Sequence, residues 1–285
     1  MMKILLTGGS GDLGQTLLPL LTAGCHSPII FDIRAPEIGT EYFRQGSLLD
    51  ISHIEDALVG CDLVIHIAAW HGIHEARGLK TPRDFWDLNV NGTYNLLQAC
   101  LIQQVTKLIH ISSSSITKLS GYYGFTKRLS EDAVKHFHEE HNLQTVTLRP
   151  RAFIPHWNQD VYSDFQEWVK RFWPGAVHID DVAQAVMLSV DLLSSDAYQD
   201  HPTLTVDREP DYPATELSNW DADGPGSSFL KYYAPFSELL TSWGLDPSLK
   251  PDTRDISETK RILGYHPHYG LRQLLTELTH HSELD

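Results

Sequence analysis

Tyr123 and Lys127 are the residues whose types and spacing most directly suggest chemistry. They lie at the end of the stretch SSSSITKLSGYYGFTK, which begins at Ser112. On a helix, side chains four positions apart share a face, so the phenol and the ammonium would lie together, whereas Tyr122 would meet Thr126. A nearby ammonium lowers the pKa of a phenol from its usual value of about 10. The pair therefore suggests a tyrosine that exchanges a proton with a hydroxyl group.

The stretch TGGSGDLG follows the apolar run KILLT and holds Gly8, Gly11 and Gly14 in a GxxGxxG pattern. Glycines where a strand turns into a helix permit a tight turn and let a pyrophosphate approach the backbone. The free N–H groups and positive dipole end of the following helix then favour the phosphates. Because strand, loop and helix agree in position, the pattern predicts a dinucleotide site. A bound nicotinamide would add its positive charge to that of Lys127 and would accept a hydride as the tyrosine takes the proton.

Asp32 ends the second apolar run, PIIFDI, and is suited to the adenosine ribose of a dinucleotide. A carboxylate there accepts hydrogen bonds from the 2′- and 3′-hydroxyls and repels a 2′-phosphate, which favours NAD over NADP. Arg34 lies two residues further on and could accommodate a phosphate, so NADP stays open as an alternative.

The elements that must position these residues alternate between short apolar runs and longer amphipathic ones. Near-continuous Ile, Leu and Val content is typical of parallel strands buried on both faces. Predicted strands are 3–7, 28–33, 62–68, 107–112, 145–149 and 203–207. Predicted helices are 12–24 with Gly24 as C-cap, 50–60 with Asp50 as N-cap, 84–104, 122–141, 178–193 begun by Asp180 or Asp181, 228–244 and 269–281. The alternation predicts an α/β fold, a Rossmann-type doubly wound parallel sheet.

The regular alternation ends after Arg149, which suggests a second, smaller unit. We expect residues 1–150 to form the dinucleotide-binding domain, which the chain rejoins over 178–207. Residues 151–177 and 208–285 would form a small substrate lobe with C-terminal helices. Residues 208–227 are rich in Pro, Gly, Asp and Ser and predict a long irregular segment.

Composition excludes several classes of function. The net charge of −15 and the lack of a Lys/Arg cluster argue against nucleic-acid binding. The 16 histidines show no pair at the i,i+4 spacing that holds zinc on a helix, so no metal is expected. No apolar run approaches the roughly 20 residues of a membrane helix, and the start MMKILLTGG does not read as a signal peptide. We therefore expect a cytoplasmic protein without membrane contact.

Several motifs together resemble one family, the extended short-chain dehydrogenase/reductases of the NAD-dependent epimerase/dehydratase group. The matching stretches occur in the family's order: TGGSGDLG, FDIR, GSLLD, VIHIAA, NVNGTYNLL, HISSSS, YGFTK, LRP, HIDDVAQAV and DISETKRILGYHPHYGL. The match thins over 151–177 and 208–250. The resemblance implies the fold and NAD binding more specifically than it implies the reaction.

The resemblance also implies roles for individual residues. Ser113 matches the substrate-orienting position, with Ser114 as the alternative; Tyr123 would be the acid/base, and Lys127 would bind the nicotinamide ribose. Asn89 would stabilise the sheet beside the site. The implied cofactor contacts are Gly8, Ser10, Gly11, Asp12, Leu13, Gly14, Asp32, Arg34, Ser47, Leu48, Ala68, Ala69, Tyr123, Lys127 and Pro150.

The chain also departs from the family's pattern. Ser47 stands where an acidic residue often meets the adenine amine. Ser114 and Ser115 stand where dehydratases carry an Asp-Glu pair, which disfavours elimination chemistry. Ser113 and Tyr123 are only ten positions apart, and Ala152 replaces a substrate-contacting Asn. A shortened site of this kind favours a small molecule over a nucleoside diphosphate sugar.

Candidate substrate contacts lie in the loop after the third long strand and after the fifth. The substrate-binding candidates are His71, Ser114, Arg151 and Trp157, with Trp70, His74, Arg77, Arg149 and His156 as further candidates. An arginine would suit a carboxylate or phosphate through its two-pronged geometry. For each of these, an ordinary loop or packing role is the alternative.

These observations favour an NAD-dependent oxidoreductase that interconverts a secondary alcohol and a ketone on a small polar substrate, with a sugar or sugar acid as the preferred class. Two alternatives stay open: an NAD-dependent epimerase of sugars or nucleotide sugars, and a non-catalytic dinucleotide-binding sensor or scaffold. The resemblance also implies a homodimer through the long helices.

Overall fold

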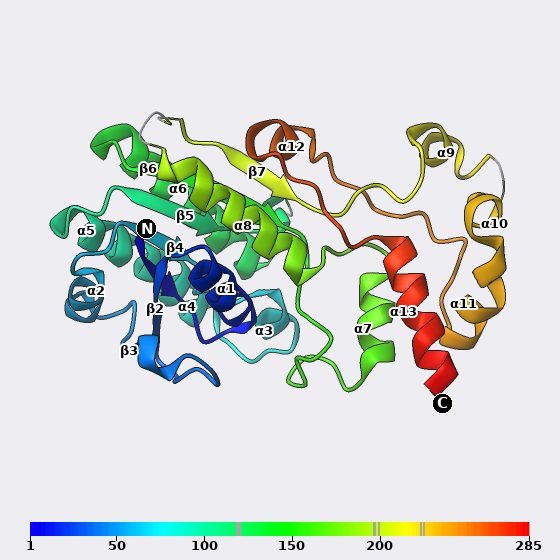
Figure 1. Cartoon of the computed structure of the whole chain (residues 1–285), viewed down its shortest axis with the longest axis horizontal. Coiled ribbons are helices and arrows are strands. Elements are labelled where there is room, and N and C mark those ends of the chain that lie inside the picture. The colour runs from blue at the N-terminus through cyan, green and yellow to red at the C-terminus, as the bar shows by residue number, and fades with distance from the viewer. Residues whose placement is uncertain (118–120, 196–197, 199, 223, 225, 285) are drawn as a thin grey trace.

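A parallel β-sheet forms the centre of the chain, as the apolar runs predict. The computed structural model describes residues 1–117, 121–195, 198, 200–222, 224 and 226–284. Within these residues the sheet has seven parallel strands in the order β3-β2-β1-β4-β5-β6-β7 (Figure 1). The strands are β1 Lys3–Thr7, β2 Ser27–Asp32, β3 Phe43–Gln45, β4 Leu63–His66, β5 Lys107–Ile111, β6 Gln144–Pro150 and β7 Thr203–Val206. The predicted doubly wound α/β fold is confirmed; the short edge strand β3 lacks a long apolar run and was not predicted.

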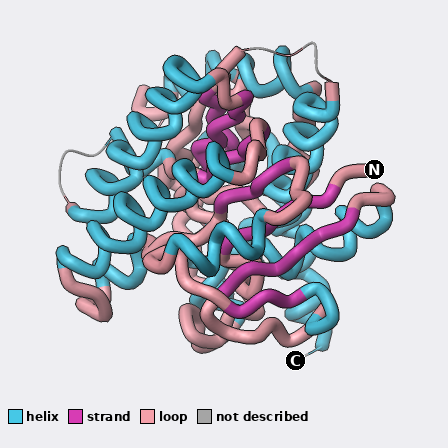
Figure 2. Tube along the Cα trace, turned by 90° about the vertical axis from the view of Figure 1, so that its left-hand side faces the viewer, coloured by secondary structure: helices cyan, strands magenta, loops and turns pink. Residues whose placement is uncertain are grey.

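Helices cover both faces of this sheet (Figure 2). On one face Ile4 and Leu6 pack with α1 and α8, and on the other Leu5 packs with α2, α5 and α6. Successive strand residues point to opposite faces, so an uninterrupted apolar run fills both cores at once. The helices are α1 Asp12–Ala23, α2 Ile51–Leu58, α5 Thr93–Ile102, α6 Tyr122–His141 and α8 Ile179–Ser194.

Helix boundaries follow the cap predictions in two cases and depart from them in one. Gly24 caps the end of α1, and the Asp50 carboxylate accepts a hydrogen bond from the Ser52 N–H at the start of α2. The prediction that Asp180 or Asp181 begins α8 is wrong. His178 is the N-cap, because its ring Nδ1 accepts from the Asp180 N–H at 3.3 Å.

Two helices predicted as continuous are broken. Residues 84–104 divide into α4 Pro82–Phe85, a π-helical segment Trp86–Gly92 and α5. Residues 228–244 divide into α10 Ser227–Tyr233, a 3₁₀ turn at Ala234–Phe236 and α11 Ser237–Trp243. In the second case Pro235 lacks the N–H needed inside a helix.

The remaining helices lie mostly in a lobe beyond β6 and β7, on the right in Figure 1. Trp168, Phe229 and Leu275 belong to its separate apolar core. Its helices are α7 Phe165–Phe172, α9 Ala214–Asn219, α10, α11 and α13 Leu271–Leu284. The expected irregular segment 208–227 therefore contains a short helix, α9.

One C-terminal segment packs on the sheet rather than on the lobe. Helix α12, Ser257–Leu263, lies against β7 and α8. Ile256, Leu263 and Tyr265 join the core beneath α8. The predicted division into a 1–150 domain with 178–207 and a lobe of 151–177 and 208–285 stays a prediction. Across the described ranges, none of the helices combines the length and apolarity that spanning a membrane requires.

Candidate active site

The glycine loop between β1 and α1 is shaped by close backbone approach. Gly8 has a φ of +68°, and a Cβ there would come within 2.7 Å of the Ala68 Cα. A Cβ on Gly14 would come within 2.4 Å of the Gly9 Cα. Both positions therefore require glycine, because neighbouring backbone already occupies the space that a side chain would need. At Gly11 the nearest atom to a Cβ would be the Gly8 carbonyl oxygen at 3.4 Å, so this glycine cradle leaves room at its middle glycine for the pyrophosphate of a dinucleotide.

The start of α1 is suited to an anion. Its N-cap residue, Gly11, forms no side-chain cap hydrogen bond to the described part of the chain. Leu13 is buried beneath this turn. The N–H groups of the first turn thus retain the free donors and positive dipole that favour phosphate.

Asp32 lies at the carboxyl end of β2 beside the glycine loop. Its carboxylate accepts hydrogen bonds from the Ser10 and Arg34 N–H groups, each at 3.2 Å. The Ser10 hydroxyl donates to the Arg34 carbonyl at 2.7 Å. The structure thereby brings three predicted cofactor residues together and fixes the carboxylate where the strand ends.

Ser47 and Leu48 lie in the turn before α2. The Ser47 hydroxyl accepts from the Leu49 N–H at 3.2 Å, and the Leu48 carbonyl accepts from the Asn95 amide at 2.9 Å. Leu48 is buried, so its side chain supports the turn rather than lying on the surface.

Other predicted cofactor residues lie at the ends of neighbouring strands. The Ala68 N–H donates to the Thr7 carbonyl at 3.0 Å, which places Ala68 and Ala69 directly beyond β4. Pro150 ends β6. These positions lie at the carboxyl edge of the sheet, where ligands of doubly wound folds bind.

Asp12 has a partner that the sequence did not indicate. Its carboxylate accepts a hydrogen bond from the Asn158 amide at 2.7 Å, across 146 positions of chain. Burial is the largest cause of the raised pKa of Asp12, and the bond from Asn158 partly offsets it. The Arg77 guanidinium holds the same segment by donating to the carbonyls of Asp160 and Val161. The first turn of α1 is thus tied to the lobe.

The predicted Ser-Tyr-Lys group is assembled by β5 and α6. Ser113 follows β5, and its hydroxyl lies near the phenol of Tyr123, which belongs to the first turn of α6. Lys127 lies one turn further along, and its Nζ donates to the Ile111 carbonyl at 2.6 Å. Tyr122 is 51% exposed, whereas Tyr123 is partly buried on the same helix. Residues 118–120 of this stretch lie outside the described residues.

Burial governs the protonation of this group. It raises the pKa of the Tyr123 phenol, and the hydrogen bond with Ser113 partly offsets the rise. This opposes the lowering predicted from the sequence, because the effect of burial outweighs that of neighbouring groups. Burial also lowers the pKa of Lys127 to about 8, while the Glu131 carboxylate raises it. Lys127 therefore remains mostly protonated at neutral pH.

A chain of buried hydrogen bonds joins the glycine loop to α6. The His66 ring bonds the hydroxyls of Thr7 at 2.7 Å and Thr93 at 2.9 Å. The Thr93 hydroxyl donates to the Asn89 carbonyl, and the Asn89 amide donates to the Thr126 hydroxyl. The Asn89 side chain also bonds the backbone of Trp70. Asn89, in the π-helical segment, therefore fixes the loop after β4 and helix α6 together.

The first helix after β4, α3 Gly72–Ala76, lies beside Tyr123. A Cβ on Gly72 would come within 3.3 Å of the Tyr123 ring. The Glu75 carboxylate accepts hydrogen bonds from the Tyr122 and Tyr123 N–H groups. His71 caps α3, and burial lowers its pKa to about 4, so it is neutral at physiological pH. Gly72 and Glu75 were missed from sequence because no motif marks them.

The other substrate candidates divide into free and engaged side chains. The Arg151 guanidinium pairs with the carboxylates of Asp207 and Asp252, so it is occupied within the lobe. Arg149 forms a two-pronged pair with Glu131. In contrast, Trp157 is 50% exposed.

Ser114 begins a 3₁₀ turn, Ser114–Thr117, directly after Ser113. Its carbonyl accepts a hydrogen bond from the Thr117 hydroxyl at 3.1 Å. Ser114 thus remains beside the substrate-orienting position that the resemblance assigns to Ser113.

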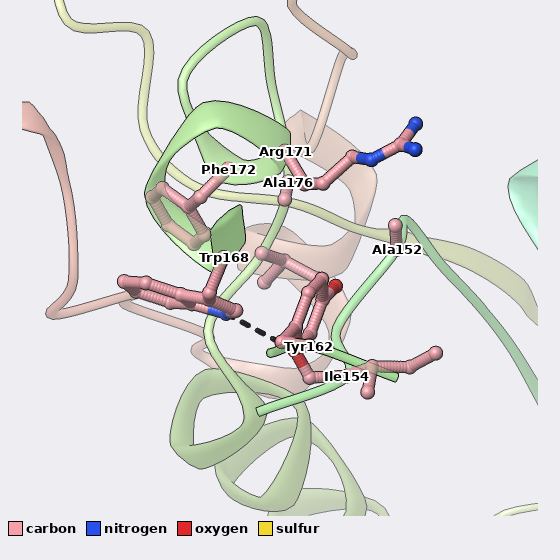
Figure 3. A pocket seen from close by; sticks show the side chains of 8 residues that line it. Ala152, Ile154, Tyr162, Trp168, Arg171, Phe172 and Ala176 are labelled. Carbon is pink, nitrogen blue, oxygen red and sulfur yellow. Dashed lines mark hydrogen bonds between the residues drawn. The ribbon is translucent and has the colours of Figure 1, made fainter. Parts of the chain in front are cut away.

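A small cavity lies next to Ala152 (Figure 3). Its volume of about 20 Å³ has room for one water or a methyl group. The Trp168 ring bounds it and donates to the Ile154 carbonyl at 3.1 Å, whereas the Arg171 side chain extends away from it.

Relatives identified by sequence include enzymes of several kinds. The chain is 30% identical over 173 residues to a 2-alkyl-3-oxoalkanoate reductase of Stenotrophomonas maltophilia, covering 53% of this chain and 50% of that protein. It is 23% identical over 212 residues to a uronate dehydrogenase of Pseudomonas syringae pv. tomato, covering 66% and 74%. The chain spans about half or less of the length of the first curated relatives it matches.

Solved structures and a family model extend this comparison. MoeE5 in complex with UDP-glucose and NAD is similar with a TM-score of 0.70 and 20% identity, covering 99% of each chain, a likeness of fold. Residues 4–199 match the model of the NAD dependent epimerase/dehydratase family. With the glycine cradle, the carboxylate at the end of β2 and the Tyr-Lys pair on α6 in the family's order, this chain belongs to the NAD-dependent epimerase/dehydratase family of the short-chain dehydrogenase/reductases.

Proposed function

We propose that this protein is an NAD-dependent oxidoreductase that interconverts a secondary alcohol and a ketone through Ser113, Tyr123 and Lys127. The observation that carries the proposal is the Ser113 hydroxyl beside the Tyr123 phenol, with the buried Lys127 one turn further along α6. It lies at the carboxyl edge of the sheet, where the glycine cradle also opens. A structural tyrosine would not need a buried ammonium one turn away.

Each side chain has a distinct task in this reaction. NAD, when bound, accepts the hydride from the alcohol carbon. Ser113 holds the substrate oxygen, and Tyr123 takes its proton. The Lys127 ammonium favours the phenolate that develops as the phenol releases its own proton to solvent. In the reverse direction Tyr123 returns the proton to the ketone oxygen.

The cofactor assignments follow from the same edge of the sheet. We assign the pyrophosphate to the loop of Gly8, Gly11 and Gly14 and the adenosine ribose to Asp32. The fixed Asp32 carboxylate supports NAD over a 2′-phosphorylated cofactor. The Arg34 backbone N–H donates to the Asp32 carboxylate, but the Arg34 guanidinium could still accommodate a 2′-phosphate. The preference for NAD over NADP is therefore tested at Arg34.

The proposed substrate is a small polar molecule, with a sugar acid preferred. Two relatives are named for acids, a uronate and an oxoalkanoate. The lack of carboxylates at Ser114 and Ser115 supports redox chemistry over elimination. The short spacing of ten positions between Ser113 and Tyr123 supports a compact substrate.

Absorbance of reduced nicotinamide tests the reaction directly. Purified protein and NAD would be incubated with uronic acids, neutral sugars, hydroxy acids and nucleotide sugars. NADH should accumulate with one class, and Tyr123→Phe should abolish its formation. Conversion of a sugar to its epimer without NADH would establish an epimerase instead. Binding of NAD with turnover of none of these classes would favour the sensor or scaffold.

We further propose a homodimer through α6 and the π-helical segment. Trp86 is 41% exposed and Phe125 is 47% exposed, and their rings lie 6.5 Å apart on these two elements. Adjacent exposed aromatic rings are typical of an interface. Light scattering should therefore give twice the chain mass of 32.2 kDa.

A further inference from the structure

Helix α6 begins without a cap of its own. Its N-cap residue, Gly121, has a φ of +95° and forms no side-chain cap hydrogen bond among the described residues. The Glu75 carboxylate caps the helix instead, with Oε1 accepting from the Tyr122 N–H and Oε2 from the Tyr123 N–H at 3.3 Å. A Cβ on Gly121 would come within 2.9 Å of Oε2, so the glycine leaves room for the carboxylate.

Glu75 is itself held by its surroundings. It lies on α3, and Arg77 at the end of that helix donates to the carbonyls of Asp160 and Val161. On the other side, the backbone of Trp70 is bonded to the Asn89 side chain. The loop that carries Glu75 is thus tied to the lobe and to the π-helical segment. It offers α6 a support that is fixed at both ends.

The position of Glu75 relative to Tyr123 gives the contact a consequence for the reaction. The Glu75 carboxylate accepts a hydrogen bond from the Tyr123 N–H, and the hydroxyl of the same tyrosine lies beside Ser113. An anion at a helix N-terminus stabilises the first turn through the free N–H groups and the dipole. Gly72, one turn earlier on α3, lies against the edge of the Tyr123 ring. Backbone and ring of Tyr123 are therefore both held from α3.

We propose that Glu75 is a positioning residue. It fixes the first turn of α6 so that the Tyr123 hydroxyl remains beside the Ser113 hydroxyl. This inference rests on the proposed oxidoreductase function. Glu75 does not exchange a proton with the substrate. Its effect is on geometry, and misplacement of a reacting group by about 1 Å can lower a rate on the order of a hundredfold.

Three variants test the proposal. Glu75→Ala removes the cap, and Glu75→Gln keeps a side-chain oxygen that can accept from the backbone. Asp255→Ala is the matched control, because the Asp255 carboxylate accepts from the Ser257 N–H at 2.9 Å at the start of the distant α12. Amide hydrogen exchange would be followed over residues 121–127, and kcat and KM would be measured with NAD and the panel substrate that yields NADH.

Glu75→Ala should speed exchange over 121–127 by about fivefold, the effect of losing one cap. It should lower kcat by about tenfold or more, with the KM for NAD within about twofold. Glu75→Gln should recover most of kcat, and Asp255→Ala should leave it unchanged.

Other results would overturn the proposal. Unchanged kcat in Glu75→Ala would remove the positioning role, and so would an equal loss of kcat in Asp255→Ala. Loss of kcat in Glu75→Gln as large as in Glu75→Ala, with exchange over 121–127 unchanged from the parent, would show that the charge acts in the chemistry. If no substrate on the panel yields NADH, the proposed reaction fails. The exchange over 121–127 then still decides whether Glu75 holds the helix.

Discussion

Lys127 should make the stability of this protein rise with pH. Its side chain is 2% exposed, and burial lowers its pKa from 10.5 to about 8. Such a drop corresponds to about 3 kcal/mol, because a tenfold change in proton affinity is about 1.4 kcal/mol. The cost arises because the folded chain must keep an ammonium out of water.

The sign follows from which state holds the proton. Below about pH 8 both states are protonated, and the folded state carries the full cost of the buried charge. Between about pH 8 and 10.5 the folded lysine loses its proton while the unfolded lysine keeps it, so the free energy of unfolding rises. Lys127→Met removes this dependence. It also loses the bond to the Ile111 carbonyl, which contributes about 1.5–3 kcal/mol at neutral pH.

Urea denaturation at several pH values measures the difference. Lys127→Met should be more stable than the parent at neutral pH, by the buried-charge cost less the lost bond. The parent should gain about 3 kcal/mol relative to Lys127→Met as the pH approaches 10.5, which reverses the order of stability. The comparison would be repeated with Tyr123→Phe in both chains, which removes titration of the neighbouring phenol. A difference that stays constant within about 0.5 kcal/mol across this range, near the error of extrapolation, would refute the reasoning.

Three further substitutions, the first with a matched control, separate steric, electrostatic and interface effects. Gly14→Ala should lower the melting temperature by several degrees and weaken NAD binding, since its Cβ would meet the Gly9 backbone. The control, Gly11→Ala, should keep the melting temperature, because its Cβ would lie 3.4 Å from the nearest atom, the Gly8 carbonyl oxygen. Asp32→Ala should raise the NADP-to-NAD preference by about tenfold in KM ratios, because repulsion of the 2′-phosphate is lost. Phe125→Glu should give monomers by light scattering if the exposed ring lies in the dimer interface.

The elements that depend on local pattern could be predicted from the sequence. Apolar runs located the long strands because burial on both faces demands continuous hydrophobic residues. Helical spacing distinguished Tyr123 from Tyr122 because only one of two adjacent side chains can face the sheet. The π-helical segment Trp86–Gly92 was not predicted, because it keeps the apolar period of a helix while adding a residue.

The parts that could not be predicted depend on contacts between distant segments. Asn158 meets Asp12 across 146 positions, and Glu75 caps Tyr122 across 47. Arg151 was a candidate for the substrate, yet its guanidinium is paired with Asp252, 101 positions away. The sequence shows which side chains are charged but not which residues they pair with. The role of such candidates can therefore be assigned only once the fold is known.

Lys127 can carry a buried positive charge beside the sheet because its neighbours His66 and His110 are uncharged. His66 and His110 are adjacent in the strand register, and their rings stack 5.4 Å apart. Burial, with a smaller contribution from the Lys127 charge, lowers the pKa of His66 to about 3. A neutral ring can both donate and accept, which lets His66 bond Thr7 on one side and Thr93 on the other. Protonation would make both nitrogens donors and set a second positive charge beside Lys127. The uncharged state of this pair thus preserves both the link from the glycine loop to α6 and the single ammonium that the proposed reaction uses.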